Sequence, residues 1–236
     1  MAHSLAPHTL AIECTTEACS VALFGDDPLA PDRLPDTLIS GDWRMLGRGH
    51  AEALIPMIAA LPGRGRAAQI VVGLGPGSFT GVRIGLAAAR ALALAWNVPV
   101  LGYPTLALIA AMARQARGAQ PVLVAMTGGH GEWFTQGFDK DFGVDTALTS
   151  LTPVDAARFG QMLVAGSQAE ALVALRGTGQ ALPLWPDARA LGLLPAWSLG
   201  SDLTPLYGRA PDAQLPRPKP ASLAPSLGQP SQITNA

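Results

Sequence analysis

The chain of 236 residues carries little charge and few of the side chains that usually perform chemistry. Only 14% of its residues are charged, the net charge is −1, and no run of lysine or arginine occurs. Proteins that hold nucleic acid at cellular salt usually place several cations on one face. We therefore expect that this chain does not bind DNA or RNA by itself.

Cysteine and histidine are also scarce, and neither forms a metal-binding pattern. Cys14 and Cys19 are the only cysteines, which excludes a disulfide framework and is typical of reduced thiols in the cytosol. His50 and His130 are the only histidines in the part that we expect to fold, and they lie far apart in the sequence. Because a metal site needs clustered ligands, we expect no metal.

Long apolar runs are few. The most apolar stretch, 84–96, is interrupted by Arg90 and is too short to span a bilayer. With no signal-peptide pattern, this predicts a cytoplasmic protein without membrane contact. Residues 1–8 lack a pattern and resemble a leader, and residues 211–236 are rich in Pro, Ser and Ala. That composition predicts a disordered tail, because it buries too little apolar surface to offset the entropy of ordering.

Between these ends the hydrophobic pattern predicts two successive sets of strands and helices. The first set is a hairpin over 9–24, a helix over 50–61, a strand over 68–74, a helix over 80–96, a strand over 98–103 and a helix over 104–117. A second set begins with a strand pair around the turn at 128–131 and ends with helices over 167–176 and 186–197. This order indicates an α/β protein with lobes over 9–108 and 109–210.

A glycine-rich loop joins the strand over 68–74 to the long helix. Its residues are Gly75, Pro76, Gly77, Ser78, Thr80 and Gly81. Such loops can bind phosphate through free N–H groups at a helix start. Here the lysine of a P-loop is missing, and Ser78 replaces the third glycine of the dinucleotide-binding pattern. The spacing favours a sharp turn and close helix packing over a phosphate site, and we expect no bound cofactor.

Ser78 is a better candidate for a helix cap than for a catalytic nucleophile. A serine nucleophile needs a base within reach and an oxyanion site, and the usual elbow sequence does not surround Ser78. A hydroxyl at the start of a long helix commonly caps that helix. We assign no catalytic residue to the chain.

The helix over 80–96 is apolar on almost all sides. Small residues and leucines surround it, and only Arg83 and Arg90 interrupt the apolar surface. A helix of this kind must be covered on most faces. Its own sheet covers one side, and the other is covered either by the helix over 50–61 alone or by a partner protein. The sequence leaves these two alternatives open.

Five segments together resemble the TsaB (YeaZ) family. They are LAIECTTEACSVAL, HAEALIPMI, GLGPGSFTGVRIGLAAARALA, PVLGYPTL and PLYGRAPDA, in this order, over residues 9–212. The resemblance implies a two-lobe fold of the actin/sugar-kinase/heat-shock-chaperone (ASKHA) class, with mixed sheets flanked by helices. It also implies a non-catalytic subunit of the bacterial complex that adds threonylcarbamoyl to the N6 of adenosine next to the tRNA anticodon.

The resemblance further implies the partners of the chain. These are a TsaD-like catalytic subunit that the chain activates, a TsaE-like ATPase that it helps to recruit, and tRNA only through the complex. The helices over 50–61 and 80–96 would pack against an equivalent pair on the TsaD-like subunit, or form a homodimer in its absence. From periodicity, we expect the contact residues to be His50, Leu54, Met57, Ile58, Arg83, Leu86 and Arg90.

Two departures from related patterns bear on activity. Nucleotide-binding members of the fold class hold phosphate with glycine-containing hairpin turns beside an aspartate that serves Mg²⁺. Here the first hairpin turn has no glycine and Glu13 replaces the aspartate, so we expect no productive ATP binding by the chain alone. In the second lobe, Thr127 replaces an acid and Gly129 replaces a basic residue. An active ATPase or phosphotransferase of the same fold is the alternative; a metal-dependent peptidase is opposed by the missing ligand set.

Overall fold

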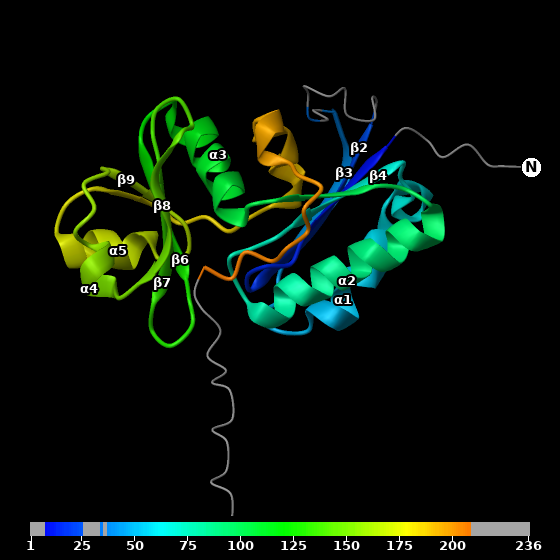
Figure 1. The fold of residues 1–236 in the computed structure, drawn as a ribbon, viewed down its shortest axis with the longest axis horizontal. Coiled ribbons are helices and arrows are strands. Elements are labelled where there is room, and N and C mark those ends of the chain that lie inside the picture. The colour runs from blue at the N-terminus through cyan, green and yellow to red at the C-terminus, as the bar shows by residue number, and fades with distance from the viewer. Residues whose placement is uncertain (1–7, 26–33, 35–36, 209–236) are drawn as a thin grey trace, which may run out of the picture.

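The computed structural model describes residues 8–25, 34 and 37–208. Two five-stranded sheets form its two lobes, which Figure 1 shows side by side with helices on their faces. The expected tail over 211–236 and nearly all of the expected leader lie outside the described residues.

The first sheet has the strand order β3-β2-β1-β4-β5. Its strands are β1 Thr9–Glu13, β2 Ala18–Gly25, β3 Thr37–Met45, β4 Gln69–Gly73 and β5 Val100–Tyr103. β1 pairs antiparallel with β2, which confirms the predicted hairpin, and parallel with β4. The helices of this lobe are α1 His50–Ala60 and α2 Phe79–Trp96, and α3 Thr105–Arg117 follows β5. These bounds confirm the three predicted helices of the first set to within one residue.

The hairpin of β1 and β2 is buried on both faces. On one face, Leu10 and Ile12 belong to a hydrophobic cluster shared with α1 and α2. On the other face, Ala11, Ala22 and Phe24 belong to a cluster shared with α3. Figure 1 shows α1 and α2 on one side of the first sheet and α3 on the other. Because helices cover both sides, every residue of β1 and β2 is buried.

The second sheet has the strand order β10-β9-β6-β7-β8. Its strands are β6 Val122–Thr127, β7 Trp133–Phe138, β8 Val144–Leu151, β9 Leu163–Ala165 and β10 Gln180–Leu182. The pairing of β6 with β7 confirms the predicted strand pair. The helices of this lobe are α4 Pro153–Ala156 and α5 Ala169–Arg176. α5 begins two residues after the predicted start at 167, and Gln168, which precedes it, makes no side-chain cap.

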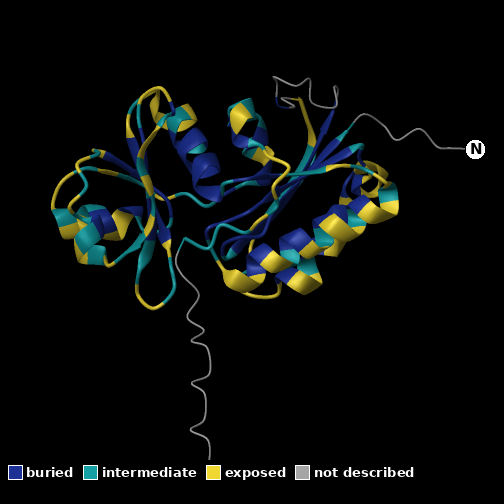
Figure 2. Cartoon of the chain, in the orientation of Figure 1, coloured by how far each residue is buried: buried dark blue, intermediate teal, exposed yellow. Residues whose placement is uncertain are grey.

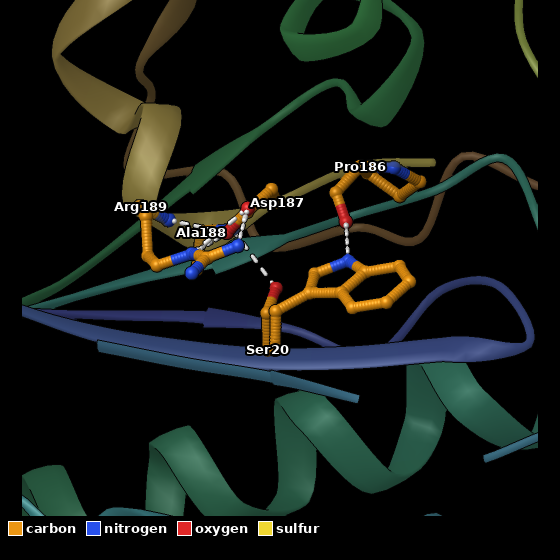
Figure 3. Close-up of polar contacts among 6 residues, drawn as sticks. Ser20, Pro186, Asp187, Ala188 and Arg189 are labelled. Carbon is orange, nitrogen blue, oxygen red and sulfur yellow. Dashed lines mark hydrogen bonds and ion pairs between the residues drawn. The ribbon is translucent and has the colours of Figure 1, made fainter. Parts of the chain in front are cut away.

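The chain after β10 returns to the first lobe. Within this return lie the short 3₁₀ turns η2 Ala188–Leu193 and η3 Ala196–Ser198, where the sequence predicts one helix; a third, η1 Pro62–Gly65, follows α1. The backbone N–H of Ala188 donates to Ser20 Oγ at 2.9 Å, and Trp43 Nε1 donates to the carbonyl oxygen of Pro186 at 3.3 Å. Figure 3 shows these contacts between β2, β3 and the return segment. Residues that we assign by sequence to the second lobe thus pack on the first sheet.

A single hydrophobic cluster joins the two lobes. It contains side chains from the first sheet, from α3, from β6, β7 and β9 of the second sheet, and from η2. Val71 and Val124 lie in the two sheets, and Leu108 and Leu191 lie between them. The two lobes therefore pack against each other, with α3 and η2 between their sheets.

One described helix, α2, is long and apolar enough to cross a membrane by length and composition alone. The apolar segment begins at Phe79, so the expectation that it is too short to span a bilayer is wrong. The core helix of a protein outside membranes passes the same test. In this chain, Val82, Leu86 and Ala89 of α2 are buried against the first lobe.

Candidate functional site

The glycine-rich loop lies between β4 and α2, beside the turn of the first hairpin. Three of its backbone N–H groups have partners inside the chain. Gly75 donates to Thr105 Oγ1 at 3.2 Å, and Ser78 donates to the carbonyl oxygen of Thr15 at 2.6 Å. Gly81 donates to the hydroxyl of Ser78 at 3.2 Å. An anion bound at this helix start would have to displace these bonds.

The glycines of the loop allow the hairpin turn to pack directly on it. A Cβ at Gly77 would lie 1.9 Å from the carbonyl oxygen of Thr15, and a Cβ at Gly81 would lie 2.1 Å from that of Cys14. Gly75 has a φ of 92°, which side-chain-bearing residues rarely adopt. The loop therefore makes the sharp turn and close packing that its spacing favours.

Ser78 caps α2. Its side chain accepts a hydrogen bond from the N–H of Gly81, and its backbone is extended, as at a typical N-cap. This confirms the capping role predicted from the sequence.

Glu13 occupies the end of β1, next to the loop, and is fully buried. Its carboxylate accepts hydrogen bonds from the N–H of Thr15 at 2.8 Å, from Tyr103 Oη at 3.0 Å and from Thr105 Oγ1 at 3.2 Å. The carboxylate also lies against Gly73, where a Cβ would be 2.3 Å from Oε2. The carboxyl group of Glu13 is thus enclosed by the chain's own side chains.

Burial governs the protonation of this acid. Burial raises the pKa of Glu13, and hydrogen bonds from Thr15, Tyr103 and Thr105 oppose that rise without overcoming it. Burial and the neighbouring Glu13 carboxyl also hold the pKa of Tyr103 well above its usual range. A carboxyl group held in this way favours its neutral form and is poorly suited to binding a cation.

The return segment closes the remaining side of the loop. The N–H of Leu206 donates to the carbonyl oxygen of Leu74 at 2.8 Å. At Gly208 a Cβ would lie 2.8 Å from the Phe134 ring of β7 and 3.3 Å from Pro76 of the loop. Backbone from the end of the described chain therefore fills the space between the loop and the second lobe.

The hairpin of the second lobe carries neutral hydrogen bonds at Thr127, one of the two positions where the family resemblance leads us to expect an acid or a base. Thr127 N donates to Ser167 Oγ at 3.0 Å, and Gln168 Nε2 donates to Thr127 Oγ1 at 2.8 Å. Nearby, Ser150 Oγ donates to Glu132 Oε2 at 2.6 Å. Within the described ranges, no three His, Cys, Asp or Glu side chains are grouped so that they could hold a metal ion.

The expected partner-contact residues divide into two groups. Five of them are buried in the chain's own core: His50, Leu54, Met57, Ile58 and Leu86. Arg83 and Arg90 are exposed on α2. Periodicity alone could not separate the inner from the outer side, because both sides of these helices are apolar. The five buried residues are therefore corrected to core positions.

The exposed side of α1 and α2 is apolar as well. We call it the outer face, and it consists of Ile55, Pro56, Ala59, Phe79, Ala87, Ala91 and Leu94. The exposed fractions are 49% for Ile55, 54% for Phe79 and 86% for Leu94. Figure 2 shows this exposure along both helices. α1 packs on α2 but leaves this face uncovered, so α1 alone does not supply the missing cover.

The two exposed arginines are held beside the outer face. The Arg83 guanidinium lies 3.4 Å from the centroid of the Phe79 ring, and its Nε donates to Tyr207 Oη at 3.4 Å. Arg90 Nη2 donates to the carbonyl oxygen of Leu203 at 3.5 Å. The return segment thus anchors both arginines along α2.

Comparison with known families agrees with this geometry. Residues 44–181, more than half of the chain, match the family model described as TsaD: tRNA N6-adenosine threonylcarbamoyltransferase. Several curated proteins that the chain resembles are TsaB proteins. The chain belongs to this family, among its TsaB (YeaZ) members. The resemblance inferred from the sequence motifs is thereby confirmed.

The individual relatives match unequal parts of the chain. The TsaB protein of Escherichia coli is 35% identical over 137 residues, which are 56% of this chain and 55% of that protein. The TsaB protein of Haemophilus influenzae is 34% identical over 122 residues, 50% of this chain and 48% of that protein. The chain spans about half the length of the curated relatives that it matches.

Solved structures cover more of the chain. YeaZ from Pseudomonas aeruginosa superposes with a TM-score of 0.65 at 24% identity, over 85% of this chain and 99% of that one. A second Pseudomonas aeruginosa structure, described as similar to peptidase YeaZ, gives 0.63 at 26% identity, over 78% and 88%. These TsaB-type structures confirm the two-lobe ASKHA-like α/β fold.

The packing of the loop predicts a large effect of adding one methyl group. Gly77→Ala should lower the free energy of unfolding by about 2–3 kcal/mol, because the new Cβ overlaps backbone at Thr15. Urea denaturation measures the loss. Gly160→Ala is the matched control, since a Cβ there meets nothing within 4 Å. Equal stability of the two variants would contradict the proposed packing role.

The raised pKa of Glu13 predicts a pH dependence. Between the ordinary glutamate pKa of 4.5 and the raised one, the native state holds a proton that the unfolded chain has lost. The stability linked to Glu13 is therefore complete below pH 4.5 and declines as the pH rises through the native pKa. Glu13→Gln lacks this titration, so its stability relative to the parent should rise with pH, by at most about 1.4 kcal/mol per pH unit.

Urea denaturation between acidic and neutral pH checks this dependence. Glu170→Gln, at an exposed position of α5, is the control and should track the parent. A stability difference between Glu13→Gln and the parent that stays constant with pH would disprove the linkage.

The close packing around the glycine-rich loop predicts that the chain binds nucleotide weakly. Calorimetric titration of the isolated chain with ATP and Mg²⁺ should give no micromolar dissociation constant, because hairpin and return-segment backbone occupy the space beside the loop. Mg²⁺ without ATP serves as the blank. A micromolar constant would favour the ATPase alternative.

Proposed function

We propose that the chain is a non-catalytic subunit in the biosynthesis of threonylcarbamoyladenosine in tRNA, in the cytoplasm. In this proposal it binds and activates a TsaD-like catalytic subunit and helps to recruit a TsaE-like ATPase. The names of its relatives support the pathway. Two observations together support the subunit role. The outer face of α1 and α2 is apolar and uncovered, and backbone of the hairpin turn and of the return segment occupies the space beside the glycine-rich loop.

The outer face is suited to pack against another pair of helices. Leu94 and Phe79 are large side chains that remain more than half exposed in the chain. Small residues, Ala87 and Ala91, lie between them on α2 and allow close approach of a partner helix. Full burial of a side chain such as Leu94 contributes roughly 1.5–3 kcal/mol. A contact of this type supplies the cover that α2 lacks.

The charges around the outer face favour a partner with carboxylates or carbonyl oxygens opposite α2. α2 carries Arg83 and Arg90 and no acid, and Glu52 is the acid of α1. Because two copies of this chain would bring the arginines of both toward one interface, a homodimer is the weaker of the two assemblies. tRNA contacts belong mainly to the partner, since the whole chain has a net charge of −1.

The direct test is reconstitution. Co-purification with a TsaD-like and a TsaE-like subunit, followed by assay of modified tRNA, should show a stable complex and modification that needs this chain. Modification at the same rate without the chain would overturn the proposal.

Substitutions on the outer face test the contact itself. Ile55→Asp and Leu94→Asp should each weaken binding to the TsaD-like subunit by about tenfold or more, because each places an unpaired charge in the contact. Binding by calorimetry measures this. Leu175→Asp is the matched control, since Leu175 is 50% exposed on α5 of the other lobe. Asp at Leu54 or Leu86 is uninformative because both are core residues.

Normal binding by both outer-face variants would show that the contact lies elsewhere. Equal weakening by Leu175→Asp would show that the effect is not specific to α1 and α2.

A further inference from the structure

Two buried thiols face each other at the end of the first hairpin. Glu13 of β1 is paired with Ser20 of β2, so Cys14 and Cys19 are the next opposed positions. Both cysteines are free, and their sulfur atoms are 3.4 Å apart. Opposed residues of antiparallel strands have Cα atoms about 4.5–5.5 Å apart, which is within the range that a disulfide spans.

The thiol pair lies under the two helices of the outer face. Cys14 and Cys19 share a hydrophobic cluster with Leu54 of α1 and Leu86 of α2. The Cβ of Cys14 is 3.5 Å from where a Cβ would stand at Gly85 of α2. On the other strand, the carbonyl oxygen of Ala18, next to Cys19, is 3.4 Å from the His50 ring at the start of α1. A movement of the chain at Cys14 and Cys19 therefore displaces residues of both α1 and α2.

We propose that Cys14 and Cys19 form a reversible disulfide with hydrogen peroxide, and that this bond weakens partner binding by displacing α1 and α2. The second half of this inference rests on the proposed function, whereas the first half does not.

The reaction balances without any other reagent. The Cys19 thiolate attacks one peroxide oxygen, which forms a sulfenic acid and, with the thiol proton, releases the other oxygen as water. The Cys14 sulfur then attacks the sulfenic sulfur, and the hydroxyl leaves as a second water with the Cys14 proton. Two thiols lose two electrons in total, and one peroxide gains them. A dithiol reductant reverses the bond by exchange.

The surroundings of the pair select both the order of attack and the oxidant. The hydrogen bond from Cys14 lowers the pKa of the Cys19 thiol, and the same bond, with burial, raises the pKa of Cys14. Cys19 is therefore the first nucleophile, since the thiolate is the reactive form. Because Cys14 and Cys19 are 1% and 0% exposed, a molecule the size of peroxide is favoured over a bulky disulfide.

Bond formation requires movement in a close-packed core. The two sulfur atoms must approach from 3.4 Å to a bond of about 2.05 Å. Protein interiors transmit such displacements to their neighbours because they have few voids. Here the neighbours are the first two turns of α1 and α2, which carry Ile55, Pro56 and Phe79 of the outer face.

The first experiment detects the bond in the full chain. After peroxide treatment, the chain is unfolded in urea and its free thiols are alkylated, and intact mass spectrometry should show a loss of about 2 Da, no alkylation, and reversal by dithiothreitol. Cys14→Ala and Cys19→Ala should instead retain one thiol that oxidises further or is alkylated. A parent chain that stays fully alkylated, or that gains oxygen without losing 2 Da, would overturn the inference.

The second experiment compares the reduced and oxidised parent, so it does not depend on any variant's folding. Oxidation should increase hydrogen exchange of amides in the first turns of α1 and α2 and weaken binding of the TsaD-like subunit by about fivefold or more. α5 in the second lobe is the internal control. Unchanged exchange and binding in the oxidised chain would overturn the switch.

The two proposals fail in different ways. If the reduced chain does not bind the TsaD-like subunit, the proposed function fails while mass and exchange still decide the disulfide switch. If the reduced chain binds and the oxidised chain binds equally well, the switch fails and the proposed function stands.

Discussion

The fold depends on backbone-to-backbone contact between the first hairpin turn and the glycine-rich loop. Thr15 and Cys14 present carbonyl oxygens where Gly77 and Gly81 have no side chains. This contact fixes where α2 begins, because the N–H of Ser78 is bonded to Thr15. It also occupies the helix start that a phosphate would otherwise use. One packing arrangement therefore accounts both for the position of the exposed helix and for the filled site.

Most of the first lobe could be predicted from its sequence, because its strong periodic patterns are also its structural elements. The hairpin, α1, α2 and α3 follow apolar spacing, and the cap at Ser78 follows from its position before a long helix. The prediction is less reliable for strands whose hydrophobic pattern is short or irregular. β8 is an edge strand of mixed exposure, and β10 is only three residues long. Such segments gain their structure from pairing with neighbours and not from local preference.

The candidate site was less predictable, for two physical reasons. The inner and outer sides of α1 and α2 are both apolar, so spacing could not show that Leu54 and Leu86 face inward while Leu94 faces outward. The enclosure of Glu13 depends on Tyr103 and Thr105, which are about 90 residues away in sequence. The sequence offers one indication, namely a glutamate at position 13 where the resemblance leads us to expect aspartate. Only the fold shows that the hydroxyl groups of Tyr103 and Thr105 lie around this glutamate.

The return segment has a consequence for how the protein is made. Residues 186–208 complete the first lobe by bonding to β2, β3 and the loop after β4, although they follow every described strand in the sequence. During translation, β2, β3 and the loop after β4 are therefore synthesised long before the residues that form hydrogen bonds with them. Nascent chains that stall before this point leave Ser20 and Trp43 without their partners and resemble folding intermediates with exposed apolar surface. The contacts of the first lobe are therefore completed late, because the strands of the second sheet lie between β5 and the segment that makes these contacts.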